Sequence, residues 1–194
     1  MTTTEIGTRT RILDVAERLV QTRGFNGFSY ADISQEIGIS KASLHYHFPT
    51  KAVLVESLVE RYERDFREAL GWIDKRHDHA LEKLKAYVGI YVRVLKADRM
   101  CLCGMLAADY TTLPQTIRAR VRHFFETNED WLTVTLSRGR VRKEVAFANK
   151  PAEAAHFLAS ALEGAMLLAR AHESVTRFRS ITASLLKGLE PAPV

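Results

Sequence analysis

Apolar residues recur at helical spacing along most of the chain, and the first such stretch lies near the N-terminus. Between Arg9 and Arg23 the apolar positions are Ile12, Leu13, Ala16, Leu19 and Val20. Steps of three and four residues place these side chains on one side of an α-helix, with polar residues on the other. Gly24 is suited to end that helix. We predict a first amphipathic helix over residues 9–23.

Two short helices are predicted next, over residues 30–37 and 41–47. Ser29 precedes the first and Ser40 precedes the second, and serine hydroxyls commonly cap helix N-termini. Gly38 lies between the two helices, where a sharp turn needs a residue with a permissive backbone. Two short helices joined by a glycine-containing turn are typical of a helix-turn-helix.

The rest of the chain continues the helical pattern, and no segment shows the sustained alternation of a strand. A long amphipathic helix is predicted from Lys51 to about Asp74. Further helices are expected over about 78–97, 99–110, 114–138, 151–172 and 174–188. The predicted fold is all-α, with about nine helices. We expect an N-terminal helix-turn-helix domain over 1–50 and a larger helical domain over 51–194.

Composition narrows the class of protein only modestly. With 46% hydrophobic and 26% charged residues, the chain is expected to fold around an apolar core. Its formal charge of +5 is compatible with a polyanionic partner but does not require one. There is no apolar run long enough for a membrane span and no signal-peptide pattern, so we expect a cytoplasmic protein without membrane contact.

Cysteine and histidine spacing gives no sign of a cofactor or a metal centre. Cys101 and Cys103 are one residue apart, which is unsuited to a disulfide within a helix, so we expect free thiols. They do not combine with His77 and His79 at a recognisable metal-ligand spacing. We predict neither a cofactor nor a metal.

The stretch from Arg9 to Leu54 resembles the tetracycline-repressor (TetR) family of bacterial regulators. The features that carry the resemblance are Gly24-Phe25 at the end of the first helix and, from Ser29, the segment SYADISQEIGISKASLHYHFPTKAVL. This resemblance implies a sequence-specific DNA-binding regulator. It also implies repression that is relieved by a small effector, with activation as the alternative. No enzyme activity is expected.

In a helix-turn-helix the second helix enters the major groove of DNA. We expect base-edge contacts from Lys41, Ala42, Ser43, His45 and Tyr46. Phosphate contacts are expected from Ser29, Tyr46, His47 and Lys51. Ser40, the cap of the second helix, completes the predicted DNA-binding set, although His47 is equally suited to a structural hydrogen bond. Three positions depart from the family pattern, which usually has Gly at Ala42, often Thr at Ser43 and usually Tyr at His45.

The resemblance also implies an effector pocket among the middle helices and a dimer interface formed by the last two. The candidate effector residues are Tyr87, Tyr91, Cys101, Cys103, Met105, Phe125, Trp131 and Phe157. We predict a homodimer through helices in 151–188. The first of these helices has a face of small and aliphatic residues, which predicts contacts from Ala155, Leu158, Ala159, Leu162 and Met166. Effector binding is expected to shift the long helix from Lys51, so that the two recognition helices change their separation and operator affinity falls.

Three other hypotheses remain open at this point. Cys101 or Cys103 could act as a sensor thiol if a neighbouring cation lowered its pKa. An enzyme could pair Cys103 with His123 or His156, although no catalytic motif accompanies them. A helical adaptor could bind a protein or a membrane through the basic cluster Arg138–Lys143, which is also explained as a solvated helix end.

Overall fold

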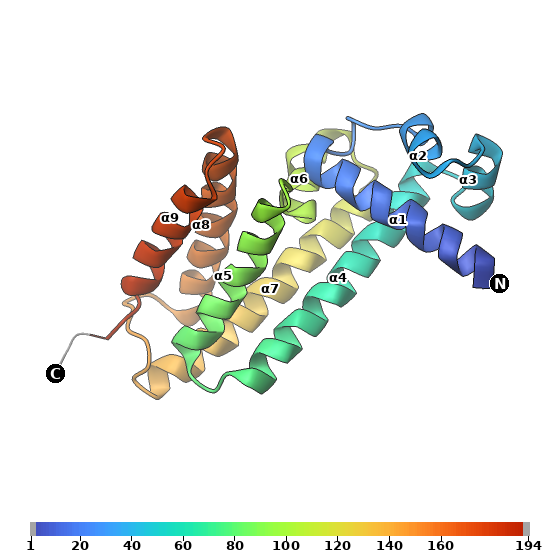
Figure 1. The fold of residues 1–194 in the computed structure, drawn as a ribbon. Helices are drawn as coiled ribbons and strands as arrows, with labels where there is room; N and C mark the ends of the chain where they lie inside the picture. Colours follow the sequence, from blue (N-terminus) through green and yellow to red (C-terminus); the bar gives the residue numbers. More distant parts are fainter. Residues whose placement is uncertain (1–2, 192–194) are drawn as a thin grey trace. The chain divides into compact units, whose positions relative to one another are not determined.

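The computed structural model describes residues 3–191, and in this part of the chain helices are joined by turns and loops, without strands. The described residues form nine α-helices and one short 3-10 helix, and Figure 1 shows how the α-helices follow one another along the chain. Their bounds are α1 Thr3–Arg23, α2 Tyr30–Ile37, α3 Lys41–His47, α4 Lys51–Arg76, α5 Ala80–Lys96, α6 Leu102–Ala108, η1 Tyr110–Thr112, α7 Gln115–Val141, α8 Pro151–Ala171 and α9 Val175–Lys187. The all-α prediction is confirmed, although α1 begins before the predicted start at residue 9.

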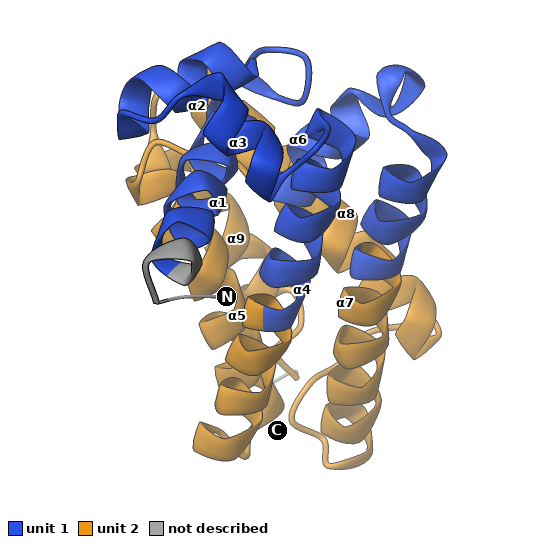
Figure 2. Cartoon of the chain, turned by 90° about the vertical axis from the view of Figure 1, so that its right-hand side faces the viewer, with its two compact units in different colours: residues 1–64, 102–124 blue, residues 65–101, 125–194 orange. Residues whose placement is uncertain are grey.

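The chain divides into two compact units, coloured separately in Figure 2. Unit 1 contains residues 1–64 and 102–124, and unit 2 contains residues 65–101 and 125–194. The helices α4 and α7 each belong in part to both units, and the chain passes from one unit to the other three times. The compact units therefore do not follow the functional boundary predicted at residue 50, because α6 and the start of α7 belong to unit 1.

The helix-turn-helix in unit 1 is shaped by its caps and by one turn. Backbone and side chain of Ser29 both contact Asp32, which forms a capping box at the start of α2. Gly38 caps the C-terminus of α2, and its φ of 71° lies in the left-handed region that favours glycine. The Ser40 hydroxyl oxygen accepts a hydrogen bond from the Ser43 N–H and caps α3. The predicted cap–turn–cap pattern is confirmed.

The core of unit 1 draws on α1, α2, α3, α4, α6 and the start of α7. Its fully covered side chains, each at most 1% exposed, include Ile12, Ala16, Leu19, Val20, Ile33, Leu44, Phe48, Leu54, Leu58, Leu102, Leu106 and Ile117. The apolar face predicted for residues 9–23 is thus buried, and α6 contributes to the same core. Burial of this aliphatic set is the main stabilising contribution to unit 1.

Unit 2 is held together mainly by α5, α8 and α9, which pack against one another. The small residues of α8 allow neighbouring helices to approach closely. Three of them, Ala155, Ala165 and Ala169, are at most 3% exposed. The rings of Tyr87 and Phe178 are fully buried: Phe178 of α9 stacks on Tyr91 of α5, and Tyr87 meets Phe66 of α4 and Trp131 of α7.

The basic cluster at the end of α7 is partly engaged by the chain itself. The guanidinium of Arg140 donates to the carbonyl of Asn149 at 3.0 Å and lies 5.0 Å from the centre of the Phe147 ring. Arg142 donates to the carbonyl of Asp78 at 3.4 Å.

Within residues 3–191, none of the helices is both long enough and apolar enough to cross a membrane.

Candidate nucleic-acid interface and effector site

The outer face of α3 presents a small, chemically mixed surface. Lys41, Ala42, His45 and Tyr46 are exposed, and the Tyr46 side chain is 72% exposed despite its aromatic ring. Ser43 is half-buried on the same short helix, while Leu44 faces inward and is fully covered. The structure therefore brings together all five residues predicted to contact base edges. A short helix that exposes both a lysine and a large aromatic ring is well suited to a polyanionic surface.

Two serines predicted to contact DNA also serve as helix caps. The Ser29 hydroxyl donates to Asp32 Oδ2 at 2.6 Å. The Ser40 hydroxyl accepts the Ser43 N–H at 3.1 Å. Both remain exposed, so each could form an additional bond to a phosphate.

His45 and His47 are oriented by the chain in different ways. The Nδ1 of His45 donates to the carbonyl of Pro49 at 3.0 Å, and its ring lies 4.8 Å from that of Tyr30. This bond leaves Nε2 as the available ring nitrogen. His47 is half-buried with its ring steeply inclined to that of Tyr46, and its carbonyl accepts a bond from Arg9.

Lys51 occupies a different position from the one expected of a phosphate ligand. Its ammonium donates to the carbonyl of Phe28 and lies over the rings of Phe28 and Phe25, 4.1 and 4.8 Å from their centres. Partial burial lowers the pKa of Lys51, while the carboxylates of Asp109 and Asp32 oppose this shift. The lysine therefore braces the turn that precedes α2. Its phosphate contact stays a prediction, now with internal partners that compete for the same ammonium.

The turn after α1 is fastened to the segment after α6 by a carboxylate that sequence reasoning missed. Asp109 Oδ2 accepts the backbone N–H of Phe25 at 2.7 Å, and Oδ1 accepts the Asn26 side-chain amide at 3.2 Å. The same amide donates to the hydroxyl of Thr112 at 2.8 Å. A Cβ on Gly24, whose φ is 75°, would lie 2.5 Å from Asp109 Oδ2. The glycine is thus needed for both its backbone angle and this close approach.

Comparison with known proteins places these features in a family. Residues 12–58 match the model of "Bacterial regulatory proteins, tetR family", and residues 80–185 match the model of the "Tetracyclin repressor-like, C-terminal domain". The second match covers more than half of the chain. The chain belongs to the TetR family. It is therefore a DNA-binding transcriptional regulator, and its α3 is the recognition helix of the family's helix-turn-helix.

Individual relatives agree with this assignment of the TetR-family chain. A TetR-family transcriptional regulator from Agrobacterium tumefaciens has a TM-score of 0.93 at 35% identity, over 96% of this chain and 99% of that one. A TetR regulator from Legionella pneumophila has a TM-score of 0.84 at 32% identity, over 93% and 96%. The nucleoid occlusion factor SlmA of Colwellia psychrerythraea is 29% identical over 79% of this chain and 78% of its own length.

The structure of the TetR-family regulator gathers only part of the predicted effector set. Tyr87, Tyr91 and Trp131 meet in unit 2, where the two tyrosine hydroxyls are 3.1 Å apart and the Trp131 ring stacks on Tyr87 with centres 5.5 Å apart. Cys101 is buried in this unit and hydrogen-bonds to Glu163 of α8. Sequence reasoning missed Glu163. The available signal was an acidic residue directly beside the apolar face of α8.

The other predicted effector residues of the regulator lie elsewhere. Cys103 and Met105 are on α6, which belongs to unit 1, and Phe125 is half-buried on α7. Phe157 is 64% exposed on α8 and lines an apolar cavity of about 320 Å³ beside α9. These four residues are therefore not part of the tyrosine cluster. Both cysteines are free thiols, as predicted.

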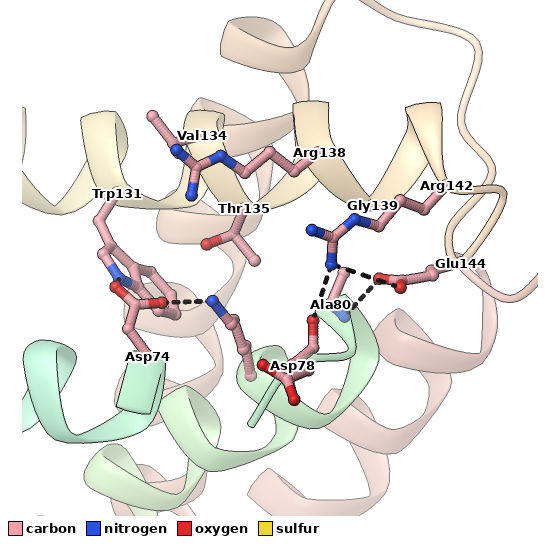
Figure 3. A pocket seen from close by; sticks show the side chains of 11 residues that line it. Asp74, Asp78, Ala80, Trp131, Val134, Thr135, Arg138, Gly139, Arg142 and Glu144 are labelled. Atoms are coloured by element: carbon pink, nitrogen blue, oxygen red, sulfur yellow. Dashed lines mark hydrogen bonds and ion pairs between the residues drawn. The ribbon is translucent and has the colours of Figure 1, made fainter. Parts of the chain in front are cut away.

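A polar cavity of about 200 Å³ lies at the junction of α4, α5 and α7 in unit 2 (Figure 3). Asp74 accepts bonds from the Lys83 ammonium at 2.6 Å and from the Trp131 indole N–H at 2.9 Å. Glu144 accepts the backbone N–H of Ala80 at 2.8 Å. These pairs join the start of α5 to α4 and α7, and they fix the orientation of the Trp131 ring.

The five residues predicted for the dimer interface are covered within the chain. Ala155, Leu158, Ala159, Leu162 and Met166 are at most 6% exposed, so they offer almost no surface to a second copy. The exposed apolar side chains of α8 are instead Phe157, Leu167 and Leu168, at 64%, 60% and 51%. The five predicted residues lie on the side of α8 that packs against its own chain. In the described part of the regulator, no group of three or more His, Cys, Asp or Glu side chains could hold a metal.

We expect Asp109→Asn to lower operator affinity about 5-fold. Asparagine keeps the size of the side chain but replaces one acceptor oxygen with a donor, so one charge-assisted hydrogen bond to the turn is lost. The ordered conformation of the turn then loses roughly 1 kcal/mol of stabilisation. A salt-controlled mobility-shift titration would measure the change. Its salt dependence should be unaltered, because the substitution removes no phosphate contact.

The matched control for Asp109→Asn is Asp98→Asn, at a 97% exposed aspartate in unit 2. This variant should bind the operator like the wild type. Wild-type affinity in Asp109→Asn, or a reduced salt slope, would contradict the positioning role of Asp109.

We also expect stability to fall between about pH 5 and pH 8 because of Glu163. Burial raises the pKa of Glu163 to about 7, and the Cys101 thiol partly opposes this shift. The folded state therefore keeps a proton that the unfolded state has lost, so the free energy of unfolding decreases as pH rises, by up to about 3 kcal/mol. Thermal unfolding across this range would show a smaller decline in Glu163→Gln.

The control for the pH experiment is Glu68→Gln, at an exposed glutamate of α4 in the same unit. It should follow the wild-type pH dependence. Parallel curves for wild type and Glu163→Gln would show that Glu163 does not titrate in this range.

Proposed function

We propose that this regulator is a repressor that leaves its operator when a small molecule binds unit 2. The observation that supports operator recognition best is the exposed face of α3, where Lys41, His45 and Tyr46 surround the small Ala42 and Ser43. Small side chains allow close approach to base edges, while the lysine and the tyrosine hydroxyl suit phosphates. The exposed positions of these residues support their assignment as the DNA-contacting set.

The effector is proposed to act near the cluster of Tyr87, Tyr91 and Cys101. Along the chain, Cys101 is followed directly by α6, and α6 is followed by Asp109, which holds the turn before α2. A ligand that favours one arrangement of the cluster can bias this segment and α4, and so lower operator affinity. This coupling requires a difference in ligand affinity between the DNA-binding and released states.

Operator binding is tested by a mobility-shift titration on the protein's own promoter against an unrelated duplex of equal length. Wild type should prefer the promoter, and Lys41→Ala should reduce the salt slope by about 0.9, the change expected when one phosphate is no longer neutralised. His45→Ala should cost roughly 1–3 kcal/mol and reduce discrimination between sequences. Equal binding of wild type to both duplexes would refute the proposal.

The control for Lys41→Ala is Lys75→Ala, at an exposed lysine of α4 that belongs to unit 2. Lys75→Ala also removes one positive charge. It should leave the salt slope unchanged if the phosphate contact comes from Lys41 on α3. Equal losses in both lysine variants would indicate that net charge, and not the recognition helix, drives binding.

A homodimer is proposed to form through the outer face of α8. Phe157, Ala161, Gly164 and Leu168 follow one another at steps of four, three and four residues, so they share one side of the helix. A Cβ on Gly164 would meet nothing within 4 Å, which leaves room for the backbone of a partner helix. Two copies are needed to read two half-sites of a symmetric operator.

We expect Leu168→Asp to weaken the dimer at least about 100-fold, because one unpaired carboxylate from each protomer would be buried. Analytical ultracentrifugation across a range of concentrations would measure this, and operator affinity should fall in parallel. Val141→Asp, at an 81% exposed valine at the end of α7, is the control and should remain dimeric. An intact Leu168→Asp dimer would place the interface elsewhere.

A further inference from the structure

The carboxyl group of Glu163 has an unsatisfied acceptor in the interior of unit 2. Its Oε1 is completely covered and has no hydrogen-bond partner among the described residues. The one side-chain hydrogen bond to the carboxyl group from this part of the chain comes from Cys101. Buried polar atoms are normally paired, because an unmade hydrogen bond costs about 1–3 kcal/mol. The lone acceptor indicates a missing donor.

No basic side chain of the described residues compensates the charge of Glu163. Within residues 3–191, no lysine, arginine or histidine forms an ion pair with it, and burial dominates the shift of its pKa. The groups around it are the hydroxyls of Tyr87 and Tyr91 and the thiol of Cys101, while Glu129 adds a second carboxylate to the field at Tyr87. Ionisation of Glu163 therefore makes the local potential negative, while Glu129 also faces His156 Nε2 at 3.6 Å.

Aromatic rings surround the polar groups. Trp131 stacks on Tyr87, with the ring centres 5.5 Å apart and an angle of 19° between the ring planes. Phe178 stacks on Tyr91 in the same way, with centres 6.3 Å apart and an angle of 20°. Phe66 meets Tyr87 edge-on at 6.0 Å. The faces of aromatic rings attract cations, and a carboxylate beside them strengthens that preference. Because Trp131 covers one face of Tyr87 and Phe178 covers one face of Tyr91, a cation would meet the opposite faces of the two tyrosine rings. The indole N–H of Trp131 donates to Asp74 and fixes the ring in this arrangement (Figure 3).

We propose that this cluster recognises a small organic cation, a primary ammonium whose N–H bonds to Glu163 Oε1 while its apolar part contacts the rings of Tyr87, Tyr91 and Trp131. The inference rests on the proposed function, since it names the chemical class of the effector. Glu163 is the specificity-determining residue: its negative charge favours ammonium compounds over neutral and anionic compounds of the same shape. The tyrosine hydroxyls add hydrogen-bonding partners for a polar substituent.

The test uses three probes of nearly equal shape, namely benzylammonium, benzyl alcohol and benzoate. Thermal unfolding and isothermal titration of the full-length protein at pH 8, without DNA, would compare them at millimolar concentration. Benzylammonium should raise the melting temperature and bind at least 10-fold more tightly than the other two. Equal effects of the three probes, a preference for benzoate or no effect of benzylammonium would overturn the proposal.

Two variants separate the role of Glu163 from general stability. Glu163→Gln should weaken benzylammonium binding at least 10-fold and leave the weak binding of benzyl alcohol unchanged. Glu68→Gln, at an exposed glutamate, should bind all probes like the wild type. Unchanged ammonium binding in Glu163→Gln would refute the assignment, and its own unfolding curve would reveal any loss of folding.

A final comparison separates this inference from the proposed repressor function. Benzylammonium is added to the complex of the protein with its promoter, and release is followed by mobility shift. Release that is lost in Glu163→Gln supports both proposals. Ammonium binding without release supports the cation site and contradicts the proposed direction of regulation. Promoter binding without any ammonium effect supports the regulator and overturns the cation site.

Discussion

Asp109 accepts hydrogen bonds from the turn after α1, and these bonds join residues that are 84 and 83 positions apart in the chain. The helix-turn-helix is too small to fix its own geometry, because its two short helices bury few side chains. Attachment to α6 and to the segment after it supplies additional core and a rigid anchor for the turn. The recognition face of α3 therefore depends on a part of the chain that lies outside the helix-turn-helix sequence.

Basic residues in unit 1 serve the interior of the protein more than its surface. Arg9 holds the carbonyl of His47, Arg11 that of Ile37, and Lys51 that of Phe28. Each cation satisfies a carbonyl at a helix end or turn, where no intrahelical donor is available. Charge counts therefore overstate the cations available to DNA. Lys41 differs from these three because it lies on the exposed recognition face of α3.

Unit 2 combines a well-packed helical core with one costly feature. Most of its buried side chains are aliphatic or small, yet the hydroxyls of Tyr87 and Tyr91 and the covered Oε1 atom of the half-buried Glu163 lie among them. A carboxyl group without a buried counter-charge destabilises the fold once it ionises. A carboxyl group of this kind is expected at a binding site. A ligand that supplies the missing hydrogen bond stabilises the complex by the free energy that the unpaired group costs the free protein.

The sequence alone determined the helices, their caps and the family, because periodicity and capping act over a few residues. It could not decide which side of α8 faces outward, since the small and the large apolar residues both fit a helix interface. It also could not find Asp109 or Glu163, or assign Lys51 to the Phe28 carbonyl. Those roles depend on which distant segments meet, and only tertiary packing brings a particular donor within reach of a particular acceptor.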